Sequence, residues 1–438
     1  MDFEREKELF RHDVLMTSAL LADLEWRGLI AQTTDRAELE KDLNAKPVSF
    51  YVGFDPTAPS LHIGNLAVIC TMRRFQLAGH KPIPLVGGAT GLVGDPSGRN
   101  EERSLNDTQT VEEWVARIRK QLEHFLSFEG KNAAIMANNL DWTAPISALT
   151  FLRDIGKHFS VNTMLSKDSV SSRLEAGGIS YTEFSYQILQ ALDYLELYKL
   201  HQCTLQMGGS DQWGNMVAGL DLIRKVAGGS GHVLTIPLIT KSDGSKFGKT
   251  AGGSIWLDPE MTSPYAFFQF WIGVEDADVE KLLKTFSFKS HEEIESLLES
   301  LRTNPGAREA HRALARELTT LVHGEHEASQ AEAAAKALFG QGELSSLDQK
   351  TLQSALSQLP RVEIKKNESI PTWVDLLAAT GVVDSKSAAR RIVKEGGAYL
   401  NNEKIEGEDF APSLEKAIYG RFFILRKGKR DLAAVELV

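Results

Sequence analysis

Two short segments of the chain combine residue types that suit phosphate chemistry. The first, His-Ile-Gly-Asn at residues 62–65, begins a stretch to Leu77 in which apolar residues repeat at helical spacing. The first turn of a helix has free N–H groups and the positive end of the helix dipole, so a phosphate would meet His62 there as a donor. Gly64 has no side chain, so a flat ring could pack on the backbone there. Taken alone, such a histidine is more often part of an ordinary helix cap.

The second segment, Lys-Phe-Gly-Lys-Thr at residues 246–250, lies in the glycine-rich stretch 242–253, which predicts a flexible loop. Its two lysines are mobile cations that could close on a triphosphate and meet charge that develops during a reaction. A solvated basic surface loop is the alternative. A P-loop is excluded, because Asp243 occupies the position of its first glycine and no buried strand runs directly into the segment. The glycine spacing over residues 88–94 likewise misses the dinucleotide-binding fingerprint.

A third group of polar residues, Tyr186, Gln190 and Asp193, falls at positions i, i+4 and i+7, which share one face of a helix. Apolar neighbours on both sides indicate that this helix is largely buried. Buried polar groups need partners. Two interpretations follow: the three side chains bind one another or solvent, or they line a pocket for a polar ligand.

The elements that must position these segments alternate along the chain. To about Trp256, short apolar runs alternate with amphipathic stretches, which predicts an α/β fold with a Rossmann-like, doubly wound parallel sheet. The predicted strands are Val48–Phe54, Pro82–Gly87, Ala133–Ala137 and Cys203–Met207. Ligands bind such sheets at the carboxyl ends of the strands. The segments after these runs are small, polar or glycine-rich, as that rule requires: 53–57, 88–91, 138–139 and 208–213.

The remainder of the chain predicts two further domains. From Ser263 to about Gly340 the pattern is helical, and residues 341–369 resemble a linker with one short helix. The small α+β unit that follows has predicted helices at Trp373–Ala379 and Ser385–Lys394, a hairpin over Gly396–Ile405 turning at Asn401 and Asn402, and a last strand at 422–425. The predicted domains are 1–256 (catalytic, Rossmann-like), 257–345 (all-helical), 346–370 (linker) and 371–438 (small, RNA-binding).

Composition narrows the classes of function. The 438 residues carry a formal net charge of −10, which disfavours bulk nucleic-acid binding by a basic surface, although basic residues cluster in the small domain. Cys70 and Cys203 make neither a disulfide framework nor a metal-ligand spacing, so a reducing, cytoplasmic setting is expected. We find no secretory signal and no apolar run near the roughly 20 residues of a membrane span, so no membrane partner is expected.

In order and spacing, the two phosphate segments resemble the paired ATP signatures of class I aminoacyl-tRNA synthetases, and the chain looks like a bacterial-type tyrosyl-tRNA synthetase. The similarity runs through residues 51–57, 94–98 and 208–214 to the C-terminal unit, which resembles a small RNA-binding fold. Asn65 replaces the second histidine of the wider class, and residues 247–248 replace a Met-Ser pair. Both replacements are usual in the tyrosine branch, so they strengthen the resemblance.

The resemblance implies a reaction in two steps. The carboxylate of L-tyrosine attacks the α-phosphate of ATP, giving tyrosyl-adenylate and pyrophosphate, and a ribose hydroxyl at the 3′ end of tRNA(Tyr) then accepts the tyrosyl group. Mg²⁺ should accompany ATP, held mostly by phosphates and water, and no protein metal site is expected. The catalytic set that the resemblance implies around the triphosphate is Thr57, His62, Asn65, Arg99, Arg103, Lys246, Lys249 and Thr250.

The resemblance also implies where the substrates bind. Tyrosine would be held by Tyr51, Asp95, Tyr186, Gln190, Asp193 and Gln212, with Tyr51 and Asp193 reading the phenol. ATP would contact Gly53, Asp55, His62, Gly209, Asp211 and Lys249. Contacts to tRNA would come from Arg390, Arg391, Lys394, Arg426 and Lys427, and the helical domain would lie toward the anticodon. Members of the family are typically homodimers, so a homodimer is expected here.

Two alternatives stay open. The tryptophan enzyme has a related fold, but an indole N–H is only a donor, whereas the Tyr51 and Asp193 pair offers both a donor and an acceptor and so suits a phenol better. An RNA-binding protein that has lost catalysis is the second alternative. The presence of His62, Lys246 and Lys249 argues against that alternative.

Overall fold

The computed structural model describes residues 20–97, 105–250, 253–365, 369–405, 407, 410–428 and 431–438. Its contacts divide the chain into two compact units. The first comprises the described residues up to Asp258 together with Glu275–Ala307, and the second comprises Pro259–Val274 together with Arg308–Val438. None of the helices in these described ranges is long and apolar enough to cross a membrane.

The first unit is built on a mostly parallel sheet. Its described strands run in the order β1-β6-β5-β2-β3-β4. They are β1 (Gln32–Thr33), β2 (Ser49–Phe54), β3 (Lys81–Val86), β4 (Ala137–Asn138), β5 (Cys203–Gly209) and β6 (His232–Ile236). All neighbours from β6 to β4 pair in parallel, and only β1 is antiparallel. The carboxyl ends of the parallel strands therefore share one edge of the sheet.

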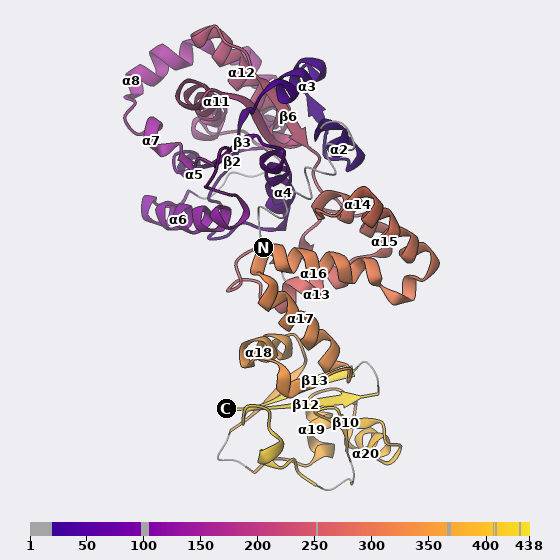
Figure 1. Cartoon of the computed structure of the whole chain (residues 1–438). Coiled ribbons are helices and arrows are strands. Elements are labelled where there is room, and N and C mark those ends of the chain that lie inside the picture. The colour runs from indigo at the N-terminus through magenta and orange to yellow at the C-terminus, as the bar shows by residue number, and fades with distance from the viewer. Residues whose placement is uncertain are drawn as a thin grey trace. The chain divides into compact units, whose positions relative to one another are not determined.

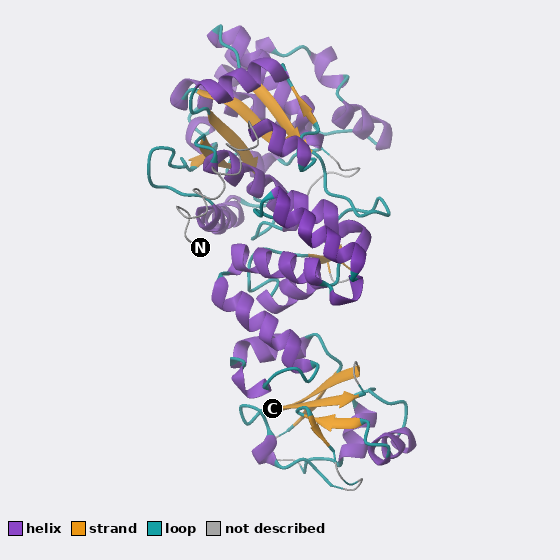
Figure 2. Cartoon of the chain, turned by 45° about the vertical axis from the view of Figure 1, so that its right-hand side comes forward, coloured by secondary structure: helices purple, strands orange, loops and turns teal. Residues whose placement is uncertain are grey.

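Helices cover both faces of this sheet (Figures 1 and 2). On one face lie α4 (Ile63–Leu77) and α6 (Thr108–Phe125), where the Phe75 ring packs 5.1 Å from that of Phe50 in β2. The other face holds α11 (Tyr181–His201) and α12 (Trp213–Ala227), and there the ring of Tyr194 lies 5.3 Å from that of Tyr51. This arrangement confirms the predicted Rossmann-like, doubly wound α/β fold.

Shorter helices complete the first unit. They are α2 (Leu20–Trp26), α3 (Arg36–Ala45), α5 (Thr90–Val93), α7 (Leu140–Thr143), α8 (Ala148–Thr150), α9 (Val161–Leu165) and α10 (Asp168–Ala176), with a π-helical turn at Phe151–Ile155. The sequence prediction missed β1 and β6, and it made β4 too long, since only Ala137 and Asn138 pair with β3. Short apolar runs do not distinguish a strand from a helix, and sheet pairing decides between them.

Helices α14 (Asp276–Phe286) and α15 (His291–Thr303) belong with this sheet, not with the helical segment in which the sequence prediction placed them. Two buried arginines bind backbone carbonyls at the end of α14 and just after it. Arg27 donates to the carbonyl of Ser287 at 2.9 Å, and Arg74 donates to that of Thr285 at 3.0 Å. A buried guanidinium needs acceptors, and the carbonyls at the end of α14 supply them.

The second unit joins helices to a second sheet. The helices are α13 (Pro264–Ile272), α16 (Glu309–His323), α17 (Glu325–Leu338), α18 (Gln349–Ser357), α19 (Trp373–Ala379) and α20 (Lys386–Lys394). The described strands run in the order β11-β10-β12-β13-β9. Their bounds are β9 (Arg361–Ile364), β10 (Ala398–Leu400), β11 (Glu403–Lys404), β12 (Phe422–Lys427) and β13 (Asp431–Leu437).

The small α+β unit confirms most of its predicted elements and corrects two. Asn401 and Asn402 have φ of 46° and 70°, as the predicted two-residue turn between β10 and β11 requires. β12 is not the last strand, because β13 follows it. β9 falls inside the predicted linker and pairs in parallel with β13, so the sheet begins before the predicted start of this domain at residue 371.

Candidate active site

The two phosphate segments lie side by side in the structure. Gly248 has φ of +82°, and a Cβ added there would come within 2.1 Å of the Ile63 side chain. The N–H of Ile63 donates to the carbonyl of Ile255 at 2.9 Å, and His62 forms an antiparallel bridge with Trp256. The start of α4 and the segment around Gly248 are therefore adjacent, as the predicted phosphate site requires.

His62 is the N-cap of α4, and its ring is held in one orientation. Its Nδ1 accepts the N–H of Gly64 at 3.0 Å, and the Asn65 side chain accepts the N–H of His62 at 3.0 Å. A Cβ at Gly64 would lie 2.8 Å from the His62 ring, so only glycine permits this packing. Because Nδ1 is an acceptor, the neutral ring carries its proton on Nε2, which is then a hydrogen-bond donor.

The other predicted phosphate contacts lie on exposed segments. Lys246 and Thr57 are exposed, and the N–H of Thr57 donates to the carbonyl of Asp55 at 2.9 Å. Strand β7 (Lys249–Thr250) pairs with β8 (Gly253–Ser254). The side chains of Lys249 and Thr250, and the whole of Arg99 and Arg103, lie outside the described residues, so their roles stay predictions.

Asp193, on α11, is the centre of a group of hydrogen-bonded polar side chains. Only 2% of the residue is exposed, and its two carboxyl oxygens accept hydrogen bonds from Asn139 Nδ2 at 3.0 Å and Trp142 Nε1 at 2.9 Å. Burial raises the pKa of Asp193 to about 8. Burial and then the Asp193 charge raise the pKa of Tyr51, whose hydroxyl is buried with no hydrogen-bond partner in the structure. The two residues expected to read a phenol thus lie near one another.

Tyr186 and Asp95 form a second polar group near the first. The Tyr186 hydroxyl donates to Asp55 Oδ2 at 2.6 Å. Burial raises the pKa of Tyr186 most, and the nearby charges of Asp55, Asp95 and Asp193 raise it further. Burial also raises the pKa of Asp95, which accepts hydrogen bonds from the Ser97 N–H and from Gln212 Nε2. On the same helix as Tyr186, Gln190 has a buried Oε1 without a partner.

The remaining predicted nucleotide contacts follow β2 and β5. Gln212 Nε2 donates to Asp211 Oδ2 at 3.1 Å as well as to Asp95, so this amide links the two carboxylates. A Cβ at Gly209 would lie 2.5 Å from Asp211 Oδ1, which explains why glycine is needed there. Gly53 is exposed at the end of β2, and its backbone faces open space.

Four residues of this site, of which Trp142 is half-buried and the others are buried, were not among the predicted site residues. Asn139 and Trp142 bind Asp193 from more than fifty positions away, and Thr90 links Asn139 to Asp55. Gln206 lies opposite Tyr51 in the sheet, with a buried Oε1 that has no partner. Thr90 and Asn139 lie in the segments 88–91 and 138–139 that follow predicted strands, and Gln206 is a polar residue inside a predicted apolar strand, so these three carried a local signal, whereas Trp142 carried none.

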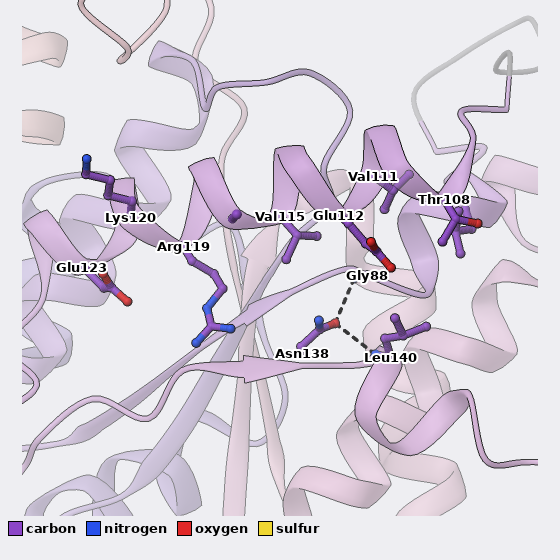
Figure 3. Close-up of a pocket in the computed structure, with 12 residues that line it drawn as sticks. Gly88, Thr108, Val111, Glu112, Val115, Arg119, Lys120, Glu123, Asn138 and Leu140 are labelled. Carbon is purple, nitrogen blue, oxygen red and sulfur yellow. Dashed lines mark hydrogen bonds between the residues drawn. The ribbon is translucent and has the colours of Figure 1, made fainter.

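A separate pocket of about 550 Å³ lies along α6, and none of the predicted substrate or catalytic residues lines it (Figure 3). Apolar side chains that include Val111, Val115 and Leu140 line it, together with Glu112 and Arg119. Asn138, the residue before Asn139, is also among the lining residues. The candidate active site is therefore the group of buried side chains around Asp193, and not this pocket.

The basic residues of the small domain differ in exposure. Arg390, Arg391 and Lys394 are exposed on α20. Arg426 is only 9% exposed, and its guanidinium lies 4.1 Å from the centre of the Tyr399 ring. Its predicted role as an RNA contact is therefore not supported, because packing against Tyr399 covers its charge. Lys427 is half-buried, and its Nζ lies 3.4 Å from Asp431 Oδ2.

Comparisons with known proteins agree with this arrangement. The family tRNA synthetases class I (W and Y) matches residues 43–340, and the tyrosine–tRNA ligase SYY-like C-terminal domain matches residues 351–435. A tyrosine–tRNA ligase of Streptomyces coelicolor is 58% identical over 420 residues, covering 95% of this chain and 99% of that relative. That of Mycobacterium leprae is 51% identical over 428 residues, covering 97% and 100%.

Solved structures give the same result. A C-terminally truncated mitochondrial tyrosyl-tRNA synthetase of Aspergillus nidulans superposes with a TM-score of 0.68 at 30% identity, covering 77% of this chain and 99% of that one. An Archaeoglobus fulgidus tyrosyl-tRNA synthetase complexed with L-tyrosine has a TM-score of 0.53 at 16% identity, which shows the shared fold alone. The chain therefore belongs to the tyrosine–tRNA ligase family of class I aminoacyl-tRNA synthetases.

Proposed function

We propose that this chain is a tyrosine–tRNA ligase that acts in two steps. In the first step a carboxylate oxygen of L-tyrosine bonds to the α-phosphorus of ATP, while the bond from that phosphorus to pyrophosphate breaks. In the second step a 3′-terminal ribose hydroxyl of tRNA(Tyr) attacks the tyrosyl carbonyl, and AMP leaves. The substrates supply both nucleophiles, so the protein contributes position and charge.

The buried polar group around Asp193 is the observation that carries this proposal. A tyrosine phenol donates to the Asp193 carboxyl and accepts from the Tyr51 hydroxyl, which is buried and has no partner among the described residues. Phenylalanine in the same place leaves both groups unpaired, which costs free energy because buried polar groups need partners. At the other end, Asp95, Tyr186 and Gln190 bind the ammonium group, and Gln212 lies toward the carboxylate.

On the nucleotide side, the phosphates of ATP lie at the start of α4. The Nε2–H of His62 donates to them, and Lys246 and Lys249 bring positive charge as pyrophosphate leaves. Asn65 keeps the His62 backbone in place through the cap of α4. Gly53, Asp55, Gly209 and Asp211 hold the rest of the nucleotide, and Mg²⁺ enters with ATP as part of the substrate.

The tRNA and a second copy of the chain are the proposed macromolecular partners. The exposed side chains of Arg390, Arg391 and Lys394 on α20 support contact with RNA phosphates. A homodimer is supported by large apolar side chains of the sheet unit that are exposed, among them Leu149 at 80% and Tyr181 at 67%. We place the reaction in the cytoplasm, where translation consumes its product.

Exchange of labelled pyrophosphate into ATP, run with each of the twenty amino acids, tests this function. Tyrosine should support exchange and tryptophan should not, since an indole offers no acceptor to the Tyr51 hydroxyl. Exchange with tryptophan alone would make the chain a tryptophan enzyme. No exchange with any amino acid, together with retained RNA binding, would favour an RNA-binding protein without catalysis.

A further inference from the structure

Four hydrogen bonds run behind the candidate tyrosine pocket and join its two ends. Asn139 Nδ2 donates to Asp193 Oδ2 at 3.0 Å and also to Thr90 Oγ1 at 2.9 Å. Thr90 Oγ1 lies 2.7 Å from Asp55 Oδ1, and Asp55 Oδ2 accepts the Tyr186 hydroxyl at 2.6 Å. The chain of bonds therefore leads from the residue that meets the phenol to the residue that meets the ammonium group.

The direction of every bond in this chain is fixed. Asn139 Oδ1 accepts the Ala89 N–H at 2.7 Å, which identifies its other terminal atom as the NH₂ group and commits both of its protons. Thr90 Oγ1 must therefore accept from Asn139, so its own proton goes to Asp55. Asp55 then accepts at both oxygens, from Thr90 and from Tyr186. The Thr90 hydroxyl is the one group that serves both ends of the chain of bonds.

The surroundings hold this chain of bonds still. Thr90 and Asn139 are 2% and 1% exposed. Next to them, Asn138 Oδ1 accepts the N–H of Gly88 at 3.2 Å and that of Leu140 at 3.0 Å, which ties together the segments after β3 and β4 (Figure 3). A Cβ at Gly88 would lie 2.4 Å from Asn138 Oδ1, so the two segments are in direct contact. Side chains in such a setting cannot rotate to replace a lost partner.

We propose that Thr90 is a positioning residue that determines selectivity for tyrosine over phenylalanine. Its hydroxyl orients the Asn139 amide, which in turn fixes Asp193 where it meets the substrate phenol, and the same hydroxyl orients Asp55 and Tyr186. Removing it leaves an Asn139 N–H unpaired, so Asp193 loses a fixed partner. This inference rests on the proposed function, since it needs a substrate whose phenol lies at Asp193.

Kinetics with two substrates and two variants test the proposal. Thr90→Val keeps the shape of the side chain and removes the hydroxyl, whereas Thr90→Ser keeps the hydroxyl. We expect Thr90→Val to lower kcat/KM for tyrosine-dependent pyrophosphate exchange by about tenfold. Exchange with phenylalanine, which has no phenol for Asp193 to meet, should fall less, so the tyrosine-to-phenylalanine ratio should drop about fivefold. Thr90→Ser should restore that ratio.

The outcomes separate this inference from the proposed function. Wild-type chain without tyrosine-dependent exchange would overturn the function itself. Normal exchange in the wild type, with an unchanged substrate ratio in a folded Thr90→Val chain, would overturn only the role of Thr90. A ratio that falls equally in Thr90→Ser would also overturn it, because packing of the methyl group would then be the cause. If thermal melting shows that Thr90→Val does not fold, the same ratio is measured in Thr90→Ala.

Discussion

The tyrosine end and the phosphate end of the candidate active site are built in different ways. Asp193 is buried on α11, and it is fixed by the buried Asn139, which follows β4, and by the half-buried Trp142 of α7. The phosphate end has exposed groups, such as Lys246 and Thr57, on segments between regular elements. Among the described side chains there, those of His62 and Asn65 are fixed by the cap of α4.

This difference follows from what each end must do. Distinguishing a phenol from a benzene ring needs groups that cannot rotate or recruit water, so burial and fixed partners are required. Meeting a triphosphate needs charge that can approach as the substrate arrives, and exposed cations on loops can do so. The tyrosine end should therefore control which substrate reacts, and the phosphate end should control how fast it reacts.

The largest effect is expected at the tyrosine end. Asp193→Ala removes the acceptor for the phenol and leaves Asn139 and Trp142 unpaired, so kcat/KM for tyrosine-dependent exchange should fall by about 10²-fold or more. Glu196→Ala on the same helix is the matched control, since Glu196 pairs with Lys199 at 2.7 Å and not with the polar group around Asp193. Exchange that survives in Asp193→Ala would break the assignment of the phenol site.

The phosphate end should respond in rate and not in tyrosine affinity. Lys246→Ala is expected to lower kcat for adenylate formation by about 10²-fold, with KM for tyrosine unchanged, because the lysine acts as charge develops on the leaving pyrophosphate. The same pattern is expected of Lys249→Ala. Lys241→Ala, in the segment just before, should behave like wild type in single-turnover measurements. A raised KM for tyrosine without a change in kcat would contradict the division between the two ends.

Contact with tRNA should be separable from both ends. A chain with Arg390, Arg391 and Lys394 all changed to Ala should keep tyrosine-dependent exchange, while kcat/KM for tRNA charging falls about tenfold or more and depends less on salt. Arg426→Ala is the comparison variant for these exposed residues. It removes a buried side chain, so it should lower the melting temperature. Equal charging by the triple variant and wild type would show that the α20 cations are only solvated surface.

A different kind of effect, on stability and not on activity, concerns the dependence of the free energy of unfolding on pH. Burial raises the pKa of Asp193 to about 8, so the folded chain binds this proton more tightly than the unfolded chain. The contribution of this group to stability is present in acid and is lost as the pH rises toward 8. The free energy of unfolding is measured in urea for both chains. The difference between Asp193→Asn and wild type should grow in favour of the variant from about pH 5 to about pH 8, by at most about 1.4 kcal/mol per pH unit.

Lys246→Ala is the control for this measurement, because the exposed phosphate end should not alter the pH dependence. If the free energy of unfolding changes with pH in the same way for wild type and Asp193→Asn, burial of the Asp193 carboxyl does not weaken the fold. That result would remove one physical difference between the two ends.

Much of the fold was predictable because its signals are local. The apolar runs of β2, β3 and β5, the helical spacing of α4 and α6, and the Asn401-Asn402 turn each depend on neighbours in the sequence. Strands β6 and β9 were missed because stretches of five and four residues gain their identity from pairing with distant strands. For the same reason the sequence placed α14 and α15 with the wrong neighbours.

The candidate active site, like the fold, has features that the local sequence predicts and features that only long-range contacts set. Residue types and spacing by themselves determined that 62–65 and 246–250 suit phosphates and that Tyr186, Gln190 and Asp193 share one face of a helix. Only the tertiary structure decided that Asn139, Trp142 and Thr90 hold Asp193 and Asp55 in place, and that Arg426 is covered. A hydrogen bond between residues fifty positions apart leaves no periodic trace in the sequence, because the path of the chain between them sets its geometry.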